Sequence, residues 1–110
     1  MFYDNLKEFL YNDNKEINEW YLSDFIDENI EKMESYTAYK EKKSALDILY
    51  KNKKEFLVIE ICYIIYALIL KSNTAELPKK FDKEKLLKIR DNKEYHAGEI
   101  IDRIFLYYRI

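Results

Sequence analysis

The chain has 110 residues, a formal net charge of −2, 48% hydrophobic residues and 16% aromatic residues. This much apolar surface can offset the entropy of ordering the chain, which excludes global disorder, and the length suffices for one core. The single Gly and single Pro exclude a sheet protein with many tight turns, because hairpins need residues with positive φ. The composition therefore predicts one all-α domain over residues 1–110.

The N-terminal third predicts a short helix followed by a longer helical stretch. Residues 2–11 place apolar side chains on one helical face, namely Phe2, Leu6, Phe9 and Leu10. Residues 15–34 carry a second stripe at helical spacing, made of Leu22, Ile26, Ile30 and Met33. Because Ser23-Asp24 can cap a fresh start, this stretch is expected to be one helix or two at an angle. We expect chain breaks at residues 12–14 and 35–37.

The next helix is expected to end near Asn52. Its predicted inner face consists of Ala38, Ala45, Leu46 and Leu49. Its predicted outer face consists of Lys40, Lys42, Lys43 and Lys51. The spacing thus predicts a helix with one apolar and one basic side.

The longest apolar run covers residues 56–70 and is interrupted by Glu60. It is shorter than the ~20 apolar residues that span a bilayer, so it predicts a central core helix at about 54–71. The expected core centre is Phe56, Leu57, Ile61, Ile64, Ile65 and Leu68. Because the run is apolar nearly all round, neighbouring helices are expected to cover every side. Glu60 should find Arg90, Arg103, a lysine or a tyrosine hydroxyl, since burying a lone carboxylate costs several kcal/mol.

Two further helices are expected after a loop over residues 73–80. Asp82 is a good N-cap, and Phe81 and Leu86 occupy the two positions of a hydrophobic staple. This helix should end or bend around 91–92, and a last helix should run to Ile110 with the stripe Ile100, Ile101, Ile104, Phe105 and Tyr108. The whole pattern predicts a compact bundle of five or six helices around the central one.

The charge is unevenly distributed along the chain. The first 36 residues carry ten carboxylates against three lysines, whereas the other 74 carry 16 basic and 11 acidic side chains. Large aromatic residues are interspersed in the acidic part, namely Phe2, Tyr3, Phe9, Tyr11, Trp20, Tyr21 and Phe25. Carboxylates steer the encounter with a basic partner, and buried rings hold the complex.

This pattern predicts a non-catalytic binding protein that blocks a basic toxin or effector, as immunity proteins and antitoxins do against nucleases. The expected partner-binding residues are Asp13, Glu16, Glu19, Trp20, Tyr21, Asp24, Asp27, Glu28 and Glu31. The lone Cys62 cannot form an intramolecular disulfide, which fits a reducing cytoplasm. We expect no cofactor, no metal and no membrane partner, since one His and one Cys far apart do not make a zinc site.

One local pattern offers an enzymatic alternative. Arg90, followed by Asp91 and with His96 five intervening residues further on, resembles the Arg-x4–6-His motif of HEPN-domain ribonucleases. The resemblance implies an all-α ribonuclease that needs no metal, with both residues near the start of a late helix. There His96 would transfer a proton and Arg90 would stabilise the phosphorane. HEPN toxins commonly carry an aromatic residue two positions after the His, where this chain has Gly98.

The same residues also fit a purely structural role. Asp91 can act as an N-cap with Glu94 as its capping-box partner, Arg90 as a complement to the preceding helix dipole, and His96 as a half-exposed first-turn residue. A structural subunit of a larger assembly is a third interpretation. Nucleic acid would be a partner only of a ribonuclease, and the basic stretches 40–54 and 79–93 could form a groove if they share a face.

Overall fold

A computed structural model describes residues 2–11 and 20–110 of the chain, and these residues form helices and no strand. The α-helices are α1 (Phe2–Tyr11), α2 (Tyr21–Asn29), α3 (Ser35–Lys51), α4 (Val58–Ser72), α5 (Lys83–Asp91) and α6 (Gly98–Tyr108). Two 3₁₀ turns, η1 (Glu55–Leu57) and η2 (Lys93–Tyr95), precede α4 and α6. The prediction of an all-α bundle around a central apolar helix is confirmed.

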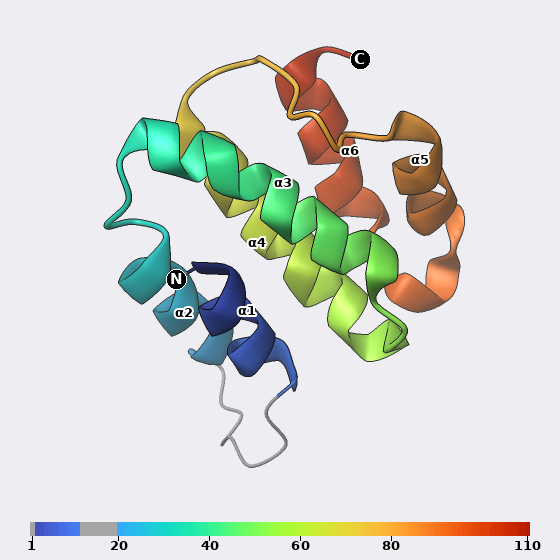
Figure 1. Cartoon of the computed structure of the whole chain (residues 1–110). Coiled ribbons are helices and arrows are strands. Elements are labelled where there is room, and N and C mark those ends of the chain that lie inside the picture. The colour runs from blue at the N-terminus through green and yellow to red at the C-terminus, as the bar shows by residue number, and fades with distance from the viewer. Residues whose placement is uncertain (1, 12–19) are drawn as a thin grey trace.

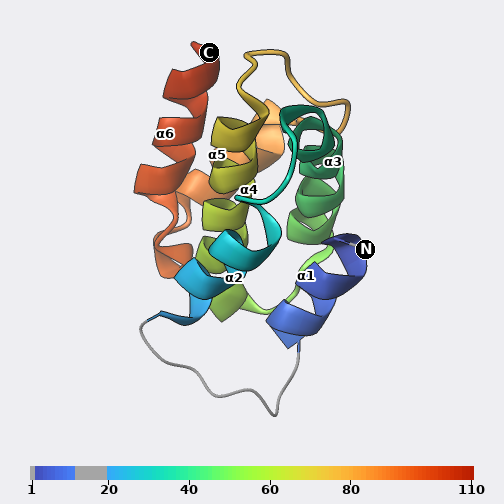
Figure 2. The ribbon, with the colours of Figure 1, turned by 90° about the vertical axis from the view of Figure 1, so that its left-hand side faces the viewer.

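Helices α3 and α4 run antiparallel and form the centre of the bundle (Figure 1). Helices α1 and α2 cover one end of this pair, α1 against α3 and α2 against α4. Helix α6 packs on α4 and on α5 at the other side (Figure 2). The bundle therefore separates the N-terminal helix pair from the C-terminal one.

Helix α4 supplies the middle of the core. Its buried side chains include Ile61, Ile64, Ile65 and Leu68, each at most 2% exposed. The prediction is wrong for Phe56, which is 73% exposed, because the η1 turn before α4 buries Leu57 and leaves the neighbouring Phe56 outside. Tyr63 and Leu70 follow it at intervals of seven residues and are 40% and 50% exposed. One stripe of this apolar helix therefore faces solvent, contrary to the expectation of cover on every side.

Two features of α3 also differ from the sequence prediction. The helix already starts at Ser35, so the break lies before residue 35 instead of at 35–37. Lys42 does not belong to the outer face, because its side chain is completely buried. It follows Ala38 by four residues and precedes Ala45 by three, which is the spacing of the inner face.

The C-terminal helices form as the sequence predicts. The Asp82 carboxylate accepts a hydrogen bond from the Lys85 amide at 3.2 Å and so caps α5. Phe81 meets the rings of Phe105 and Tyr108 edge-on, with centroids 6.5 and 5.5 Å apart. The predicted stripe of α6 is buried throughout. The cap and these ring contacts fix the path of the chain from the 73–80 loop into α5.

Substitution at the core centre gives a direct test of this arrangement. Ile64→Asp should lower the free energy of unfolding by more than ~4 kcal/mol, because it places a charge without a partner among apolar side chains. Phe56→Asp is the matched control and should change stability by less than ~0.5 kcal/mol, since Phe56 is exposed and precedes a helix N-terminus. Circular dichroism and thermal melting measure both. Equal losses in the two variants would contradict the burial pattern.

Candidate functional sites

Aromatic contacts hold α1 and α2 together and decide which sides of these helices face solvent. The Phe9 ring lies 4.3 Å from both Tyr21 and Phe25 between centroids, and it stacks on Tyr21. Phe2 and Phe25 add a tilted contact at 6.2 Å. With these rings turned inward, the polar positions of both helices point outward.

We define the acidic face as the exposed carboxylates of α1, of α2 and of the segment that leads into α3. Its described members are Asp4, Glu8, Asp24, Asp27, Glu28, Glu31 and Glu34. None of these seven forms an ion pair with a residue that the structure describes. Lys7 and Lys32 are the exposed basic residues in the same described segments. The two helices lie side by side at one end of the α3–α4 pair (Figures 1 and 2).

The predicted partner-binding residues have different surroundings. Asp24, Asp27, Glu28 and Glu31 are exposed, and Trp20 is 63% exposed. Tyr21 is half-buried, and its hydroxyl donates a 2.7 Å hydrogen bond to the Phe9 carbonyl oxygen. Asp13, Glu16 and Glu19 lie outside the described residues. Tyr21 therefore holds α2 against α1, and Trp20 is the ring that a partner can reach.

Glu60 lies where its charge acts on Tyr21. Burial, and to a smaller extent the nearby Glu60 carboxylate, raises the pKa of the Tyr21 phenol to about 12. The sequence suggested a tyrosine hydroxyl as one possible partner of Glu60. The Tyr21 hydroxyl lies close enough for the charge of Glu60 to act on it. This arrangement links α4 to the N-terminal helices.

The Arg and the His of the Arg-x5-His pattern occupy different kinds of position. Arg90 lies in the last turn of α5, and His96 is an exposed residue with φ of 55° between η2 and α6. The expected placement of both residues near the start of one late helix is therefore wrong. The Arg90 guanidinium contacts Asp91 at 3.1 Å and Asp102 at 3.4 Å. The hydrogen bond that Arg90 donates to Asp91 and the charge of both aspartates raise the pKa of Arg90.

The expected helix cap is formed by a neighbouring residue. The Asn92 side chain, and not Asp91, accepts the hydrogen bond from the Glu94 amide at 3.0 Å. Asp91 is the last residue of α5 and binds Arg90. The capping prediction for Asp91 and Glu94 is wrong because the chain leaves α5 one residue later than the pattern suggested.

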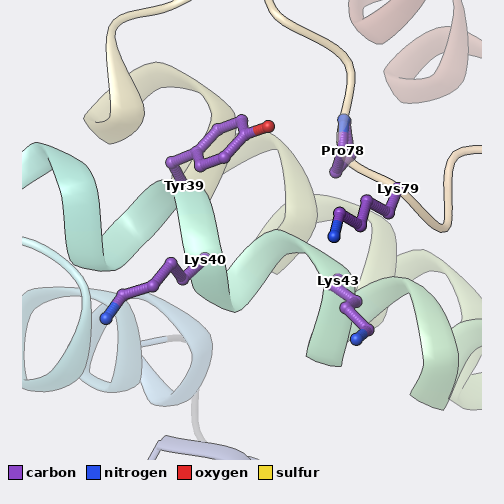
Figure 3. Close-up of a pocket in the computed structure, with 5 residues that line it drawn as sticks. All are labelled: Tyr39, Lys40, Lys43, Pro78 and Lys79. Carbon is purple, nitrogen blue, oxygen red and sulfur yellow. The ribbon is translucent and has the colours of Figure 1, made fainter.

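A second surface is basic and lies between α3 and the 73–80 loop. A hollow of about 320 Å³ is lined by Tyr39, Lys40, Lys43, Pro78 and Lys79. Lys43 comes from α3 and Lys79 from the loop that passes over it, whereas the ammonium group of Lys40 is turned away from them (Figure 3). No carboxylate is among these lining residues. Lys43 and Lys79 thus border the same small space, and no anion is among the residues that line it.

Two further hollows continue this surface toward α5. The next, of about 430 Å³, shares Lys79 with the first, and the third, of about 200 Å³, shares Tyr50 and Lys85 with the second. We call the three together the basic groove; its lysines are Lys40, Lys43, Lys51, Lys79, Lys80, Lys85 and Lys88. Its two acidic lining residues are Asp47 and Asp82. The basic stretches 40–54 and 79–93 therefore share a face, which the sequence left open.

Lys42 lies behind the first hollow with its ammonium group inside the protein. It contacts Ser72 Oγ and Tyr108 Oη, both at 3.2 Å, and lies 4.6 Å from the Tyr39 ring centroid. Burial lowers the pKa of Lys42 to about 8, and the charge of Glu76 in the loop opposes part of this shift. No carboxylate within the described residues forms an ion pair with it. The surroundings are thus hydroxyl groups and rings from α3, α4 and α6.

Metal and membrane sites receive no support from the described residues. No group of three or more metal-ligating side chains occurs among residues 2–11 and 20–110. No helix in the same ranges has the length and apolar character needed to cross a bilayer. Comparison with known proteins adds no homologue, because no family model, no curated protein and no solved structure matches the chain.

The buried lysine gives a pH-dependent prediction. The pKa of Lys42 is about 8 in the folded chain and about 10.5 when unfolded, so between these values the unfolded state binds the extra proton. Stability of the wild type should therefore rise from pH 8 to pH 10 relative to Lys42→Met. At pH 7 we expect Lys42→Met to melt at a higher temperature than the wild type, because it removes a buried charge.

Thermal melting of the two proteins at several pH values measures this difference. Tyrosines that do not touch Lys42 titrate alike in both proteins. Burial raises the pKa of Tyr39 and Tyr108, the two that do touch it. A gap in melting temperature that stays constant from pH 7 to pH 10 would contradict the depressed pKa.

The ribonuclease alternative stays a prediction with its own test. If Arg90 and His96 are catalytic, the purified chain should cleave RNA without a divalent metal, and His96→Ala should abolish cleavage without changing the melting temperature. Incubation with varied RNA substrates, with EDTA and with magnesium, measures this. RNA left intact by the wild type under all these conditions would rule the activity out.

Proposed function

We propose that the chain is a non-catalytic inhibitor that binds a basic, nuclease-type toxin or effector through its acidic face. The observation that carries this proposal is the set of seven exposed carboxylates without an ion pair among the described residues. A nuclease must attract phosphates, so the surface around its active site is basic. An acidic face of this kind competes for that surface by the same electrostatic attraction.

The local chemistry favours a protein partner for this face. Carboxylates that have no ion pair in the free protein can accept new cations without first breaking an existing contact. Trp20 adjoins this set at the start of α2 and is mostly exposed. Trp and Tyr are common energetic centres of interfaces, so Trp20 is the proposed anchor among charged neighbours.

The geometry gives less support to the ribonuclease alternative. The Arg90 guanidinium is engaged by Asp91 and Asp102, and a phosphate would have to displace these carboxylates. His96 and Arg90 also do not lie on one helix. We therefore propose inhibition, and not catalysis, as the main function.

Charge reversal on the acidic face tests the proposal. The candidate partners to screen are basic nucleases encoded by genes that adjoin this one, if such genes exist. The double substitution Asp24→Lys and Glu31→Lys should slow association with a nuclease that the wild type binds at least tenfold at low salt. The loss should shrink as salt rises, because screened charges steer the encounter less. Association rates from surface binding measurements and rescue of cell growth on co-expression give two readouts.

The matched control is Glu84→Lys with Glu94→Lys. Both residues are exposed carboxylates of the α5–η2 region, and the change in net charge is the same. This control should leave association and growth rescue unchanged. Equal losses in both double variants, or no binding by the wild type, would contradict a role for the acidic face.

A further inference from the structure

We infer that the basic groove between α3 and the 73–91 segment is a second binding site and that its ligand is single-stranded nucleic acid. This site is separate from the acidic face and does not depend on the proposed inhibition. Its three hollows follow one another along the same side of α3, because they share Lys79, Tyr50 and Lys85. The ligand must therefore be an extended anion and not a single ion.

The charge balance of the groove favours an anionic ligand. Asp47 is already engaged by Lys51 at 3.1 Å and by Lys80 at 3.6 Å. Asp82 is committed to the α5 cap. Lys40, Lys43, Lys79, Lys85 and Lys88 form no ion pair with a residue that the structure describes. Because the Lys40 ammonium group is turned away from the first hollow, the groove keeps four cations that neighbouring carboxylates do not neutralise.

The dimensions of the groove suit a chain of phosphates. From Lys40 to Lys51, helix α3 advances by about 16 Å, since each residue adds about 1.5 Å. A strand laid along it can contact several consecutive phosphates. Lysines act as flexible point charges without fixed geometry, which suits the repeated phosphates of a backbone better than one specific phosphate group.

Aromatic side chains in the wall favour a single strand over a duplex. Tyr39, Tyr50, Phe81 and Tyr95 line the three hollows, and all are partly exposed. Unpaired bases can stack on such rings, whereas bases inside a duplex cannot reach them. The hollows of about 200–430 Å³ have room for a base but not for the width of a double helix.

The buried Lys42 strengthens the field at one end of the groove. Its ammonium group lies beneath Tyr39, whose ring forms part of the first hollow. Glu76 is the acidic group that acts on Lys42 and on Tyr39 from the loop. A phosphate in the hollow would add a second negative charge near this buried cation.

Binding of 12-nucleotide single strands, measured by fluorescence anisotropy, tests the inference. The probes are oligo-dT, oligo-U, a duplex of the same length and inorganic polyphosphate. Single strands should bind most tightly, and log K should fall with log salt with a slope of about −2 to −3.5, as expected for three to five phosphate contacts. The double substitution Lys43→Ala and Lys79→Ala should weaken binding at least tenfold and flatten this slope by about 1.4.

The control variant Lys7→Ala with Lys32→Ala removes the same charge from exposed positions outside the groove. It should bind the single strands as the wild type does, and melting temperatures should show that both variants are folded. Tighter binding of the duplex or of polyphosphate, equal losses in both variants, or no binding at 50 mM salt would overturn the inference. The acidic-face variants keep the groove intact, so failure of one proposal leaves the other standing.

Discussion

The antiparallel packing of α3 against α4 is the interaction on which every other element depends. Buried Ile, Leu and Ala side chains of the two helices form one continuous core with residues from all the other α-helices. Helices this short are marginal in water by themselves, so their stability comes from burying an apolar face. Helices α1 and α2 bury their apolar faces at one end of the pair, and α5 and α6 bury theirs at the other. The same packing therefore decides which polar surfaces remain outside.

Because of this packing, the acidic and the basic segments of the sequence lie on different surfaces of the fold. The acidic residues lie on the helices that cover one end of the α3–α4 pair, and the basic groove runs between α3, the loop and α5. A net charge of −2 therefore hides two fields of opposite sign. Because the field of exposed charges falls off over about 8 Å in physiological salt, each surface acts mainly on charges close to it.

The sequence predicts much of the fold, because helix periodicity and caps are local signals. The stripe of α6 and the Asp82 cap follow directly from spacing, and both are confirmed. Lys42 shows the limit of predicting burial from residue type. It lies at an inner-face position of α3, but its charge suggested that it is exposed. Its burial depends on the Ser72 and Tyr108 hydroxyls, which lie 30 and 66 residues away. The prediction for Phe56 fails for the opposite reason. Its apolar side chain suggested burial, but an apolar side chain is buried only where another element covers it.

The candidate sites are less accessible to sequence reasoning, because they arise from contacts between distant segments. Charge counting alone locates the acidic segment, but it cannot tell that Tyr21 is turned inward onto Phe9 while Trp20 is left exposed. Nor can it tell that Arg90 meets Asp102 across α5 and α6. The groove needs both the α3–α4 packing and the return of the loop at Pro78 to bring Lys43 and Lys79 together.

The placement of Lys43 and Lys79 at one hollow has an energetic consequence. Like charges that share one hollow repel each other, and the repulsion lowers the stability of the folded chain relative to a surface with interspersed signs. An anion in the groove would relieve this repulsion and would stabilise the fold by linkage, since it binds only where the lysines are assembled. The acidic face carries the same kind of repulsion with the opposite sign. Both surfaces therefore carry a repulsion that a surface with interspersed charges of both signs would avoid.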